Sequence, residues 1–308
     1  MMKMEEENRN KNNDQLFLAG MVLSMFCWGL SWASGKVLSG YGEILSIALV
    51  RFAITFTSLF LILLLIKEKL RVERKGWFDL IAAALCMALY NYFFFKGLFH
   101  GKPGAGGVLV TTLNPIISYA IMLLMTRRKP TRKETIGLLI GVVAGVILLR
   151  VWIDWKSIFA SGNLYFVSAT IIWAVLSLFT ARGSRYGSPI AFSLWLYAIA
   201  FVAILTLSNA DATKLLITQG DLYFWANMLF SAVITTTLAT TFYFVATSKI
   251  GASKASSFIF LVPFSAALGS WFFLHEIPQW YTVVGGVLGI GAVYVINKRD
   301  QVSVVRDQ

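Results

Sequence analysis

Few residues of this chain have the chemistry that catalysis or metal binding needs. Two histidines, His100 and His275, stand alone, and neither has a partner at a spacing typical of a catalytic dyad or a metal cluster. Two cysteines, Cys27 and Cys86, lie in apolar runs, which excludes a disulfide framework and a cysteine-based metal site. We therefore expect no enzyme, no catalytic residue, no metal ion and no cofactor.

The side chains that could do chemistry are polar and aromatic groups inside long apolar stretches, where they could bind a solute. An amide in hydrocarbon needs a partner, so Asn91 and Asn114 should face a cavity or a neighbouring helix. Paired aromatic rings could sandwich a ring, an apolar side chain or a cation. Core packing and hydrogen bonds between helices are the alternatives. The predicted substrate-binding residues are Trp28, Trp32, Asn91, Thr111, Asn114, Trp173, Thr240 and Tyr243.

Four further residues are candidates for gating or hinge motion. Arg51 lies about seven residues inside an apolar stretch, where a guanidinium is costly unless paired or hydrated. It could be a latch or gate, or contact the substrate directly, and Glu43 is a possible partner. Pro115 and Pro263 each remove a backbone hydrogen bond. No carboxylate lies at the centre of a stretch, so Glu276 and Glu43 are only weak candidates for proton coupling.

The elements that position these residues must be membrane helices. Hydrophobic residues make up 57% of the 308 residues and charged residues only 14%, and the mean hydropathy is +0.71. A soluble domain has about 25% charged residues. The apolar runs are long and lack period-2 alternation, which favours helices over barrel strands. Ten stretches are long enough to cross a bilayer: 16–35, 44–66, 77–97, 104–126, 134–153, 161–181, 188–207, 221–246, 253–274 and 278–297.

The basic residues indicate the orientation of these spans. Twenty Lys and Arg residues fall at the two termini and in the loops of one side, and six on the other side. By the positive-inside rule, both termini are cytoplasmic, and we expect a multi-pass protein of the inner (cytoplasmic) membrane. The net charge of +12 is then a topology signal, and no nucleic-acid partner is expected. The expected partners are a small-molecule substrate and membrane lipid.

An internal repeat divides the chain into two halves. An offset of 148 residues aligns 90–150 with 238–298 without a gap, and it pairs Pro115 with Pro263 and Pro130 with Pro278. Five spans in each half would insert the second half in the opposite direction, as in many secondary transporters. We predict a polar cytoplasmic tail without fixed structure over 1–15, five-helix repeats over 16–155 and 156–297, and a second cytoplasmic tail over 298–308.

Glycine recurs at four-residue spacing in the fifth and tenth spans. Gly137, Gly141 and Gly145 form one such stripe, and Gly285 and Gly289 form another. Small residues at this spacing let helices approach closely. We expect the stripes to pack inside a monomer, although a homodimer through the glycine-rich helices is the alternative.

Together these features resemble the drug/metabolite transporter superfamily, and within it the EamA-type ten-helix transporters. The resemblance covers about residues 16–297. Two departures make the halves chemically unequal: Arg127–Arg128 replaces the acid that commonly ends the fourth helix of the family, and Leu196 stands opposite Arg51. The segments that carry the resemblance are WGLSWASGK (28–36), LVRF (49–52), TTLNP (111–115), GLLIGVVAG (137–145), FLVPFSAALGSWFFLHEIP (260–278) and GGVLGIGAVY (285–294).

The resemblance implies an all-α integral membrane fold, with ten helices in two inverted five-helix repeats around a central cavity. It implies a secondary transporter that moves small organic solutes, such as amino acids or similar amphipathic metabolites, outward by alternating access. A strongly anionic substrate is disfavoured because Arg51 is the only basic group within a span. An exporter of lipophilic drugs or aromatic cations is the alternative, followed by a passive channel or a membrane-embedded enzyme.

Overall fold

The computed structural model describes residues 2–127, 129–150, 152–153, 162–243 and 258–297, and over these residues the regular structure is helical. Its one β-bridge joins Val72 to Gly187. The main helices are α1 (Met2–Ser39), α2 (Ile44–Ile66), α3 (Trp77–His100), α4 (Pro103–Thr126), α5 (Arg132–Leu149), α6 (Asn163–Gly183), α7 (Pro189–Leu205), α8 (Ala210–Gln219), α9 (Leu222–Leu229), the π-helix η4 (Phe230–Thr240), α12 (Leu261–Leu274) and α13 (Trp280–Asn297). Short 3₁₀ turns are η1 (Arg74–Gly76), η3 (Ser184–Tyr186) and η5 (Phe258–Phe260).

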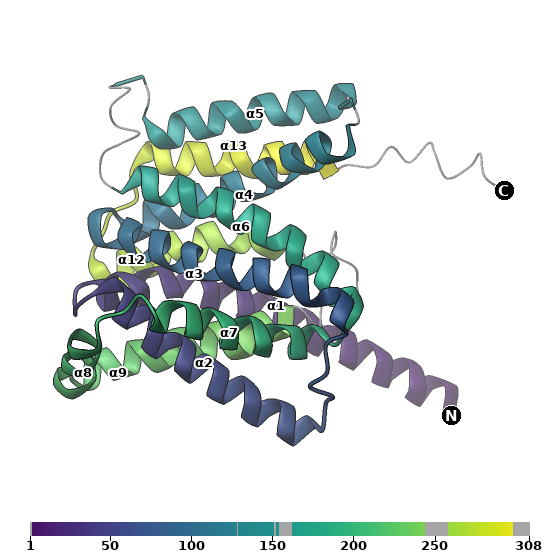
Figure 1. Cartoon of the computed structure of the whole chain (residues 1–308). Coiled ribbons are helices and arrows are strands. Elements are labelled where there is room, and N and C mark those ends of the chain that lie inside the picture. The colour runs from purple at the N-terminus through teal and green to yellow at the C-terminus, as the bar shows by residue number, and fades with distance from the viewer. Residues whose placement is uncertain (1, 128, 151, 154–161, 244–257, 298–308) are drawn as a thin grey trace.

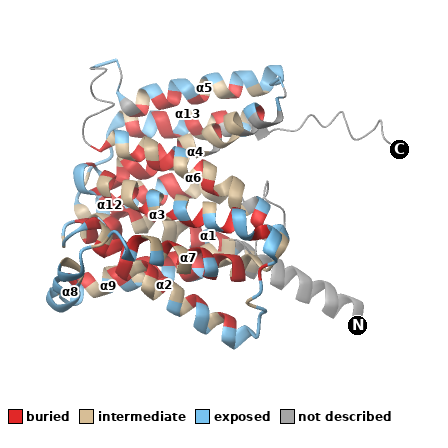
Figure 2. Ribbon diagram, in the orientation of Figure 1, coloured by how far each residue is buried: buried red, intermediate tan, exposed pale blue. Residues whose placement is uncertain are grey.

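The length and apolar character of the helices confirm an all-α membrane protein. Six helices in the described ranges are long and apolar enough to cross a bilayer, or seven if the bent pair α7 and α8 is counted as one span. Large apolar side chains such as Leu65, Phe78 and Leu222 are exposed on the outside of the bundle. In water this surface would be unfavourable, but in a bilayer it is the face that contacts lipid. Figure 2 shows the buried residues gathered along the inner faces of the helices.

The helices pack side by side, and several of the contacts join distant parts of the sequence. α3 lies against α6 and α7, α2 lies against α7, and α1 lies against α12 and η4 (Figure 1). At the top of the view in Figure 1, α5 packs along α13, and both contact α4. The buried core is built from the facing sides of these helices.

Close packing of α13 on α4 and α5 explains two of the predicted glycines. A Cβ added at Gly289 would lie 1.8 Å from Thr112 Cγ2 on α4, and one added at Gly285 would lie 2.6 Å from Leu148 Cγ on α5. On α5, a Cβ at Gly141 would lie 2.5 Å from Ile116 Cδ1 of α4. These glycines therefore pack against neighbouring helices of the same chain, where a larger side chain would not fit.

Two expectations about the ends of elements were wrong. α1 begins at Met2, so the segment expected to lack fixed structure is helical. The connection expected over 208–220 contains α8, which is bent by 112° from α7. Asn209 caps α8 by accepting hydrogen bonds from the N–H groups of Asp211 and Ala212.

Other boundary expectations lie partly outside the described residues. These are the predicted division between 155 and 156, the C-terminal tail 298–308, and the start of the ninth span at 253. Pro115 lies within α4, as expected. Pro263 is the third residue of α12, directly after the 3₁₀ turn η5, so it lies near the start of that helix rather than at its middle.

The π-helix η4 changes which threonines share a face. In it the hydroxyls of Thr236, Thr237 and Thr240 donate to carbonyls five residues earlier, where an α-helix would offer the carbonyl four residues earlier. In an α-helix Thr237 and Thr240 would share a face, but here Thr237 Oγ1 lies 2.7 Å from Ser58 Oγ of α2. Such wide turns often occur at functional sites.

Candidate functional site

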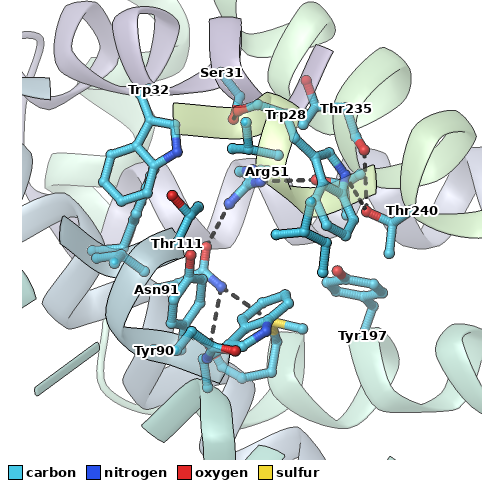
Figure 3. Close-up of a pocket in the computed structure, with 18 residues that line it drawn as sticks. Trp28, Ser31, Trp32, Arg51, Tyr90, Asn91, Thr111, Tyr197, Thr235 and Thr240 are labelled. Carbon is cyan, nitrogen blue, oxygen red and sulfur yellow. Dashed lines mark hydrogen bonds between the residues drawn. The ribbon is translucent and has the colours of Figure 1, made fainter. Parts of the chain in front are cut away.

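A cavity of about 120 Å³ lies among the helices, with walls from both halves of the chain (Figure 3). Helices α1, α2, α3 and α4 line one part of it, and α6, α7, η4, η5 and α12 line the rest. Its walls combine aromatic rings with a few polar groups, the usual composition of a site for a small organic molecule.

Seven of the eight predicted substrate-binding residues line this cavity, and they come from α1, α3, α4, α6 and η4. These residues are Trp28, Trp32, Asn91, Thr111, Asn114, Trp173 and Thr240. The eighth, Tyr243, does not line it but contacts Trp28, with ring centroids 5.1 Å apart. The structure thus brings the predicted residues together, and their role in binding remains a proposal.

Arg51 also lines the cavity, and its partners differ from the expected one. Its Nη1 donates to Asn91 Oδ1 over 2.6 Å, and its Nη2 donates to Thr236 Oγ1 over 2.8 Å. Glu43 is exposed and accepts a hydrogen bond from Ser46 over 3.0 Å, so it is not the partner of Arg51. The reason is geometric: Arg51 lies two turns further along α2, and its side chain points to α3 and η4.

The side chains around Arg51 are held in place by the backbone. Asn91 Nδ2 donates to the carbonyl of Met87 over 3.0 Å, which leaves its Oδ1 facing the guanidinium. The Thr236 hydroxyl donates to the carbonyl of Ser231 over 2.9 Å, so its oxygen is free to accept from Arg51. Figure 3 shows Arg51 projecting between Asn91 and the threonines of η4.

Trp28 lines another part of the cavity wall. Its Nε1 donates to Thr240 Oγ1 over 3.2 Å, which joins α1 to η4. Trp32, one turn further along α1, is buried and packs edge-on against Phe94, with centroids 4.9 Å apart. Trp28 is therefore available to a solute, whereas Trp32 mainly closes the wall behind it.

Sequence reasoning missed several residues of the cavity wall. Tyr90 packs on Trp173 with centroids 4.6 Å apart, and Tyr197 reaches the cavity from α7. Both tyrosines lie near the middle of predicted spans, 77–97 and 188–207, where a phenolic hydroxyl is a polar group in hydrocarbon, and this is the signal that could have indicated them. The other missed lining residues are Ser31, Met87, Phe94, Val110, Thr235, Thr236, Ile259 and Val262.

Three polar atoms on residues of the cavity wall have no hydrogen-bond partner in the described structure. They are Asn114 Nδ2 and Arg51 Nε, both donors, and the hydroxyl oxygen of Thr235. A buried polar group without a partner is costly, and a bound solute or water can satisfy it. These atoms therefore mark positions where a ligand would gain hydrogen bonds.

Glu276 lies elsewhere, in the connection between α12 and α13. It helps to line a small separate pocket with Lys102 and Ser270, and its Oε2 is buried with no partner among the described residues. Burial raises the pKa of this carboxyl above its ordinary value, and the positive charges of Lys102 and Lys36 act in the opposite direction. Lys36 is itself held by the carbonyls of Leu98, Phe99 and Gly101 at the end of α3.

A comparison with known families decides the identity of the chain. The EamA-like transporter family matches residues 16–151 and again residues 160–298. The chain belongs to this family. It is thus a multi-pass membrane protein of the drug/metabolite transporter superfamily, and its family points to a transporter rather than an enzyme.

Relatives of this EamA-like protein extend over most of its length. The uncharacterized transporter YyaM of Bacillus subtilis is 23% identical, with 88% of this chain and 92% of that protein covered. A probable terminal-alkyne amino-acid exporter of Streptantibioticus cattleyicolor is 22% identical, with 91% and 92% covered. A crystal structure of 16% identity superposes with a TM-score of 0.61 over 90% of this chain and 96% of that one, a likeness of fold.

Proposed function

We propose that this EamA-like protein is a secondary transporter that exports small organic solutes, amino acids or similar amphipathic metabolites, by alternating access. The observation that carries the proposal is the cavity, because residues of both halves of the chain meet there around an aromatic and polar interior. A secondary transporter binds its substrate at such a junction. One relative is named as a probable amino-acid exporter, which agrees with this substrate class.

The proposed architecture is ten helices in two inverted five-helix repeats, over 16–155 and 156–297. Helix bounds support it: the offset of 148 residues that aligns the prolines carries Arg132–Leu149 (α5) onto Trp280–Asn297 (α13). The same offset carries the end of α4, Thr126, onto the end of α12, Leu274. Equivalent helices of the two halves would then begin and end together.

The packing of the helices supports the same repeat. If α1 to α5 correspond to α6, α7, α9 with η4, α12 and α13, most of the larger contacts between halves have a counterpart, although that of α4 with α13 does not. The contact of α1 with α12 matches that of α6 with α4, α3 with α6 matches η4 with α1, and α3 with α7 matches η4 with α2. The pairs α2 with α7, α4 with α12 and α5 with α13 are their own counterparts. This is the pattern of a two-fold relation.

We place the protein in the inner (cytoplasmic) membrane with both termini and the basic loops in the cytoplasm. The basic segments of 67–76 and 182–187 support this, because they contact each other: the N–H of Glu73 donates to the carbonyl of Tyr186 over 2.9 Å. The start of α1 and the end of α13 lie at the same end of the bundle as these loops (Figure 1). Anionic lipids of the cytoplasmic leaflet would attract the basic residues at this end of the bundle.

In the proposed cycle the two halves rock about the cavity. Pro115 in α4 and Pro263 in α12 are the proposed hinges, since each lacks a backbone N–H in a helix that walls the cavity. Arg51 would act as a gate by joining α2 to α3 and η4, and Glu276 would act at the far end of α12. We propose a monomer, because the glycine stripes are filled by the chain's own helices.

Solute counterflow in proteoliposomes tests this function. Vesicles loaded with an unlabelled solute receive a trace of the labelled one, with a panel of amino acids, nucleobases and one aromatic cation, each with and without a pH gradient. The proposal predicts transient, saturable accumulation of one class. A channel would only dissipate the gradient, and exchange of the aromatic cation alone would favour the drug exporter.

A further inference from the structure

The cavity holds one positive charge that no described residue balances. Among the described residues, Arg51 hydrogen-bonds to neutral groups, the amide of Asn91 and the hydroxyl of Thr236. Its Nε is buried and has no hydrogen-bond partner in the same part of the chain. The cavity wall includes no Asp or Glu side chain among the described residues. Arg182 and Asp79 form an ion pair, but neither residue lines the cavity.

An unbalanced charge of this kind is unusual inside a membrane protein. Charged groups within spans almost always pair with an opposite charge or lie along the path of a substrate or ion. Glu43, the nearest acid by sequence on α2, is exposed and engaged with Ser46, so it does not serve as the counterion. A ligand with one negative charge would supply the missing partner.

The geometry of the guanidinium suits a carboxylate. A guanidinium carries five N–H donors in a planar fork, and the hydrogen bonds to Asn91 and Thr236 use two of them, which leaves three. A carboxylate accepts two parallel N–H bonds from such a fork. Because Asn91 and Thr236 are themselves fixed by backbone carbonyls, the fork is held in one orientation before the ligand arrives.

The rest of the cavity suits a short apolar body. Rings of Trp28, Tyr90 and Trp173 form its walls, and Asn114 Nδ2 offers one more unpartnered donor. Its volume of about 120 Å³ is close to the roughly 150 Å³ of a known cavity that admits benzene. A second negative charge on the ligand would find no further Lys or Arg in the described wall, and a cation would be repelled by Arg51.

We propose that Arg51 is the carboxylate receptor of this cavity, and that the transported solute is a small organic monocarboxylate with an apolar body, amino acids included. The proposal deepens the transport function proposed above and rests on it, because binding in the cavity does not by itself mean that the solute is transported. Asn91 and Thr236 are positioning residues, which set the orientation of the guanidinium. This substrate class excludes the lipophilic cation among the alternatives.

Binding to the purified full-length chain in detergent micelles tests the proposal without measuring transport. Two matched pairs of probes differ only at the carboxyl group: isovalerate with isovaleramide, and valine with valinamide. Binding is followed by quenching of tryptophan fluorescence, since Trp28 and Trp173 line the cavity, and by thermal stabilisation. We expect each acid to bind at least about tenfold more tightly than its amide, the size typical of hydrogen bonds to a charged group.

Two variants identify Arg51 as the cause. Arg51→Gln should remove the preference for the acid. Asn91→Asp keeps Arg51 but places a carboxylate oxygen 2.6 Å from Nη1, so it should neutralise the charge of the guanidinium and weaken the acids about tenfold relative to the amides. Arg185→Gln, which removes an exposed arginine of η3, is the matched control and should keep the preference.

Amides that bind as tightly as acids would overturn the proposal, as would a preference that survives in Arg51→Gln or the binding of neither member of either pair. Counterflow separates this result from the transport function. Counterflow of an uncharged or cationic solute with no acid preference would leave the transporter and remove the carboxylate receptor. Arg51-dependent binding of acids without any counterflow would leave the carboxylate receptor and remove the transporter.

Discussion

The guanidinium of Arg51 on α2 and the hydroxyl of Thr236 on η4 are 2.8 Å apart and hydrogen-bonded, so one bond joins helices from the two halves of the chain. In the proposed cycle the halves move relative to each other. A bond across their junction would therefore be present in one arrangement of the halves and absent or changed in another. In the two proposals above, Arg51 would combine the roles of gate and substrate contact, between which the sequence could not decide.

Replacing Thr236 by Val removes the acceptor of Arg51 Nη2 at nearly constant shape. We expect thermal unfolding in micelles to show a loss of about 1–3 kcal/mol, the range for a hydrogen bond to a charged group. Thr218→Val, which changes an exposed threonine of α8, is the control and should have little effect. An equal loss in both variants would mean that the bond to Arg51 contributes nothing specific.

Replacing Trp28 by Ala removes a ring of the cavity wall and its hydrogen bond to Thr240. We expect counterflow of the transported solute to show a KM raised by about threefold to tenfold, since an aromatic contact contributes about 0.5–1.5 kcal/mol. Membrane insertion should be unchanged. Trp280→Ala, at an exposed position, is the matched control. Identical KM values for both variants would remove Trp28 from the site.

Gly289 and Gly291 on α13 offer a matched test of helix packing. A Cβ at Gly289 would lie 1.8 Å from Thr112 Cγ2, whereas a Cβ at Gly291 meets nothing within 4 Å. We expect Gly289→Ala to lower stability by about 1–3 kcal/mol through overpacking. Gly291→Ala should be neutral or stabilising by up to about 1 kcal/mol, because Ala favours the helix. Equal melting temperatures would mean that α13 does not approach α4 this closely.

Glu276 should make stability depend on pH. Because burial raises its pKa in the folded chain, the folded state favours the protonated carboxyl, and stability falls as the pH rises from the ordinary glutamate range through the raised pKa. Lys36, Lys102 and Tyr281 are the charged or titratable groups around it. Glu276→Gln should therefore match the wild type at acidic pH and exceed its melting temperature at neutral pH.

The control for this variant is Glu73→Gln, because Glu73 is exposed. It should follow the wild type across the whole pH range. A wild type that becomes more stable than Glu276→Gln as the pH rises would contradict the assignment, since it would mean that Lys102 and Lys36 stabilise the ionised carboxylate by more than burial destabilises it.

The sequence was sufficient for the parts of the site that obey a simple rule. Asn91, Asn114 and Thr111 are polar residues in apolar stretches, and hydrocarbon offers them no partner, so their convergence on a cavity could be expected. Tyr90 and Tyr197 also lie near the middle of predicted spans, 77–97 and 188–207, but a tyrosine ring packs among apolar side chains as readily as it lines a cavity, so the sequence does not separate the two.

Other parts depend on backbone geometry that the sequence does not reveal. The π-helix turns Thr236 toward Arg51 and Thr237 toward Ser58, whereas an α-helical projection groups Thr237 with Thr240. Glu43 was the expected partner of Arg51 because the two are close in sequence, but in the folded chain Arg51 donates a hydrogen bond to Asn91 on α3. The bend that places α8 after α7 was missed because its ten residues were too few and too polar to suggest a span.

Accessibility of the cavity to a thiol reagent tests the central claim, that a solute passes through this cavity, most directly. Thr111→Cys would be introduced after Cys27 and Cys86 are replaced by Ala, and a membrane-impermeant maleimide would be added to either face of oriented vesicles. The account predicts labelling from both faces and protection by the solute that exchanges in counterflow. Labelling that this solute leaves unchanged, or labelling from neither face, would contradict it.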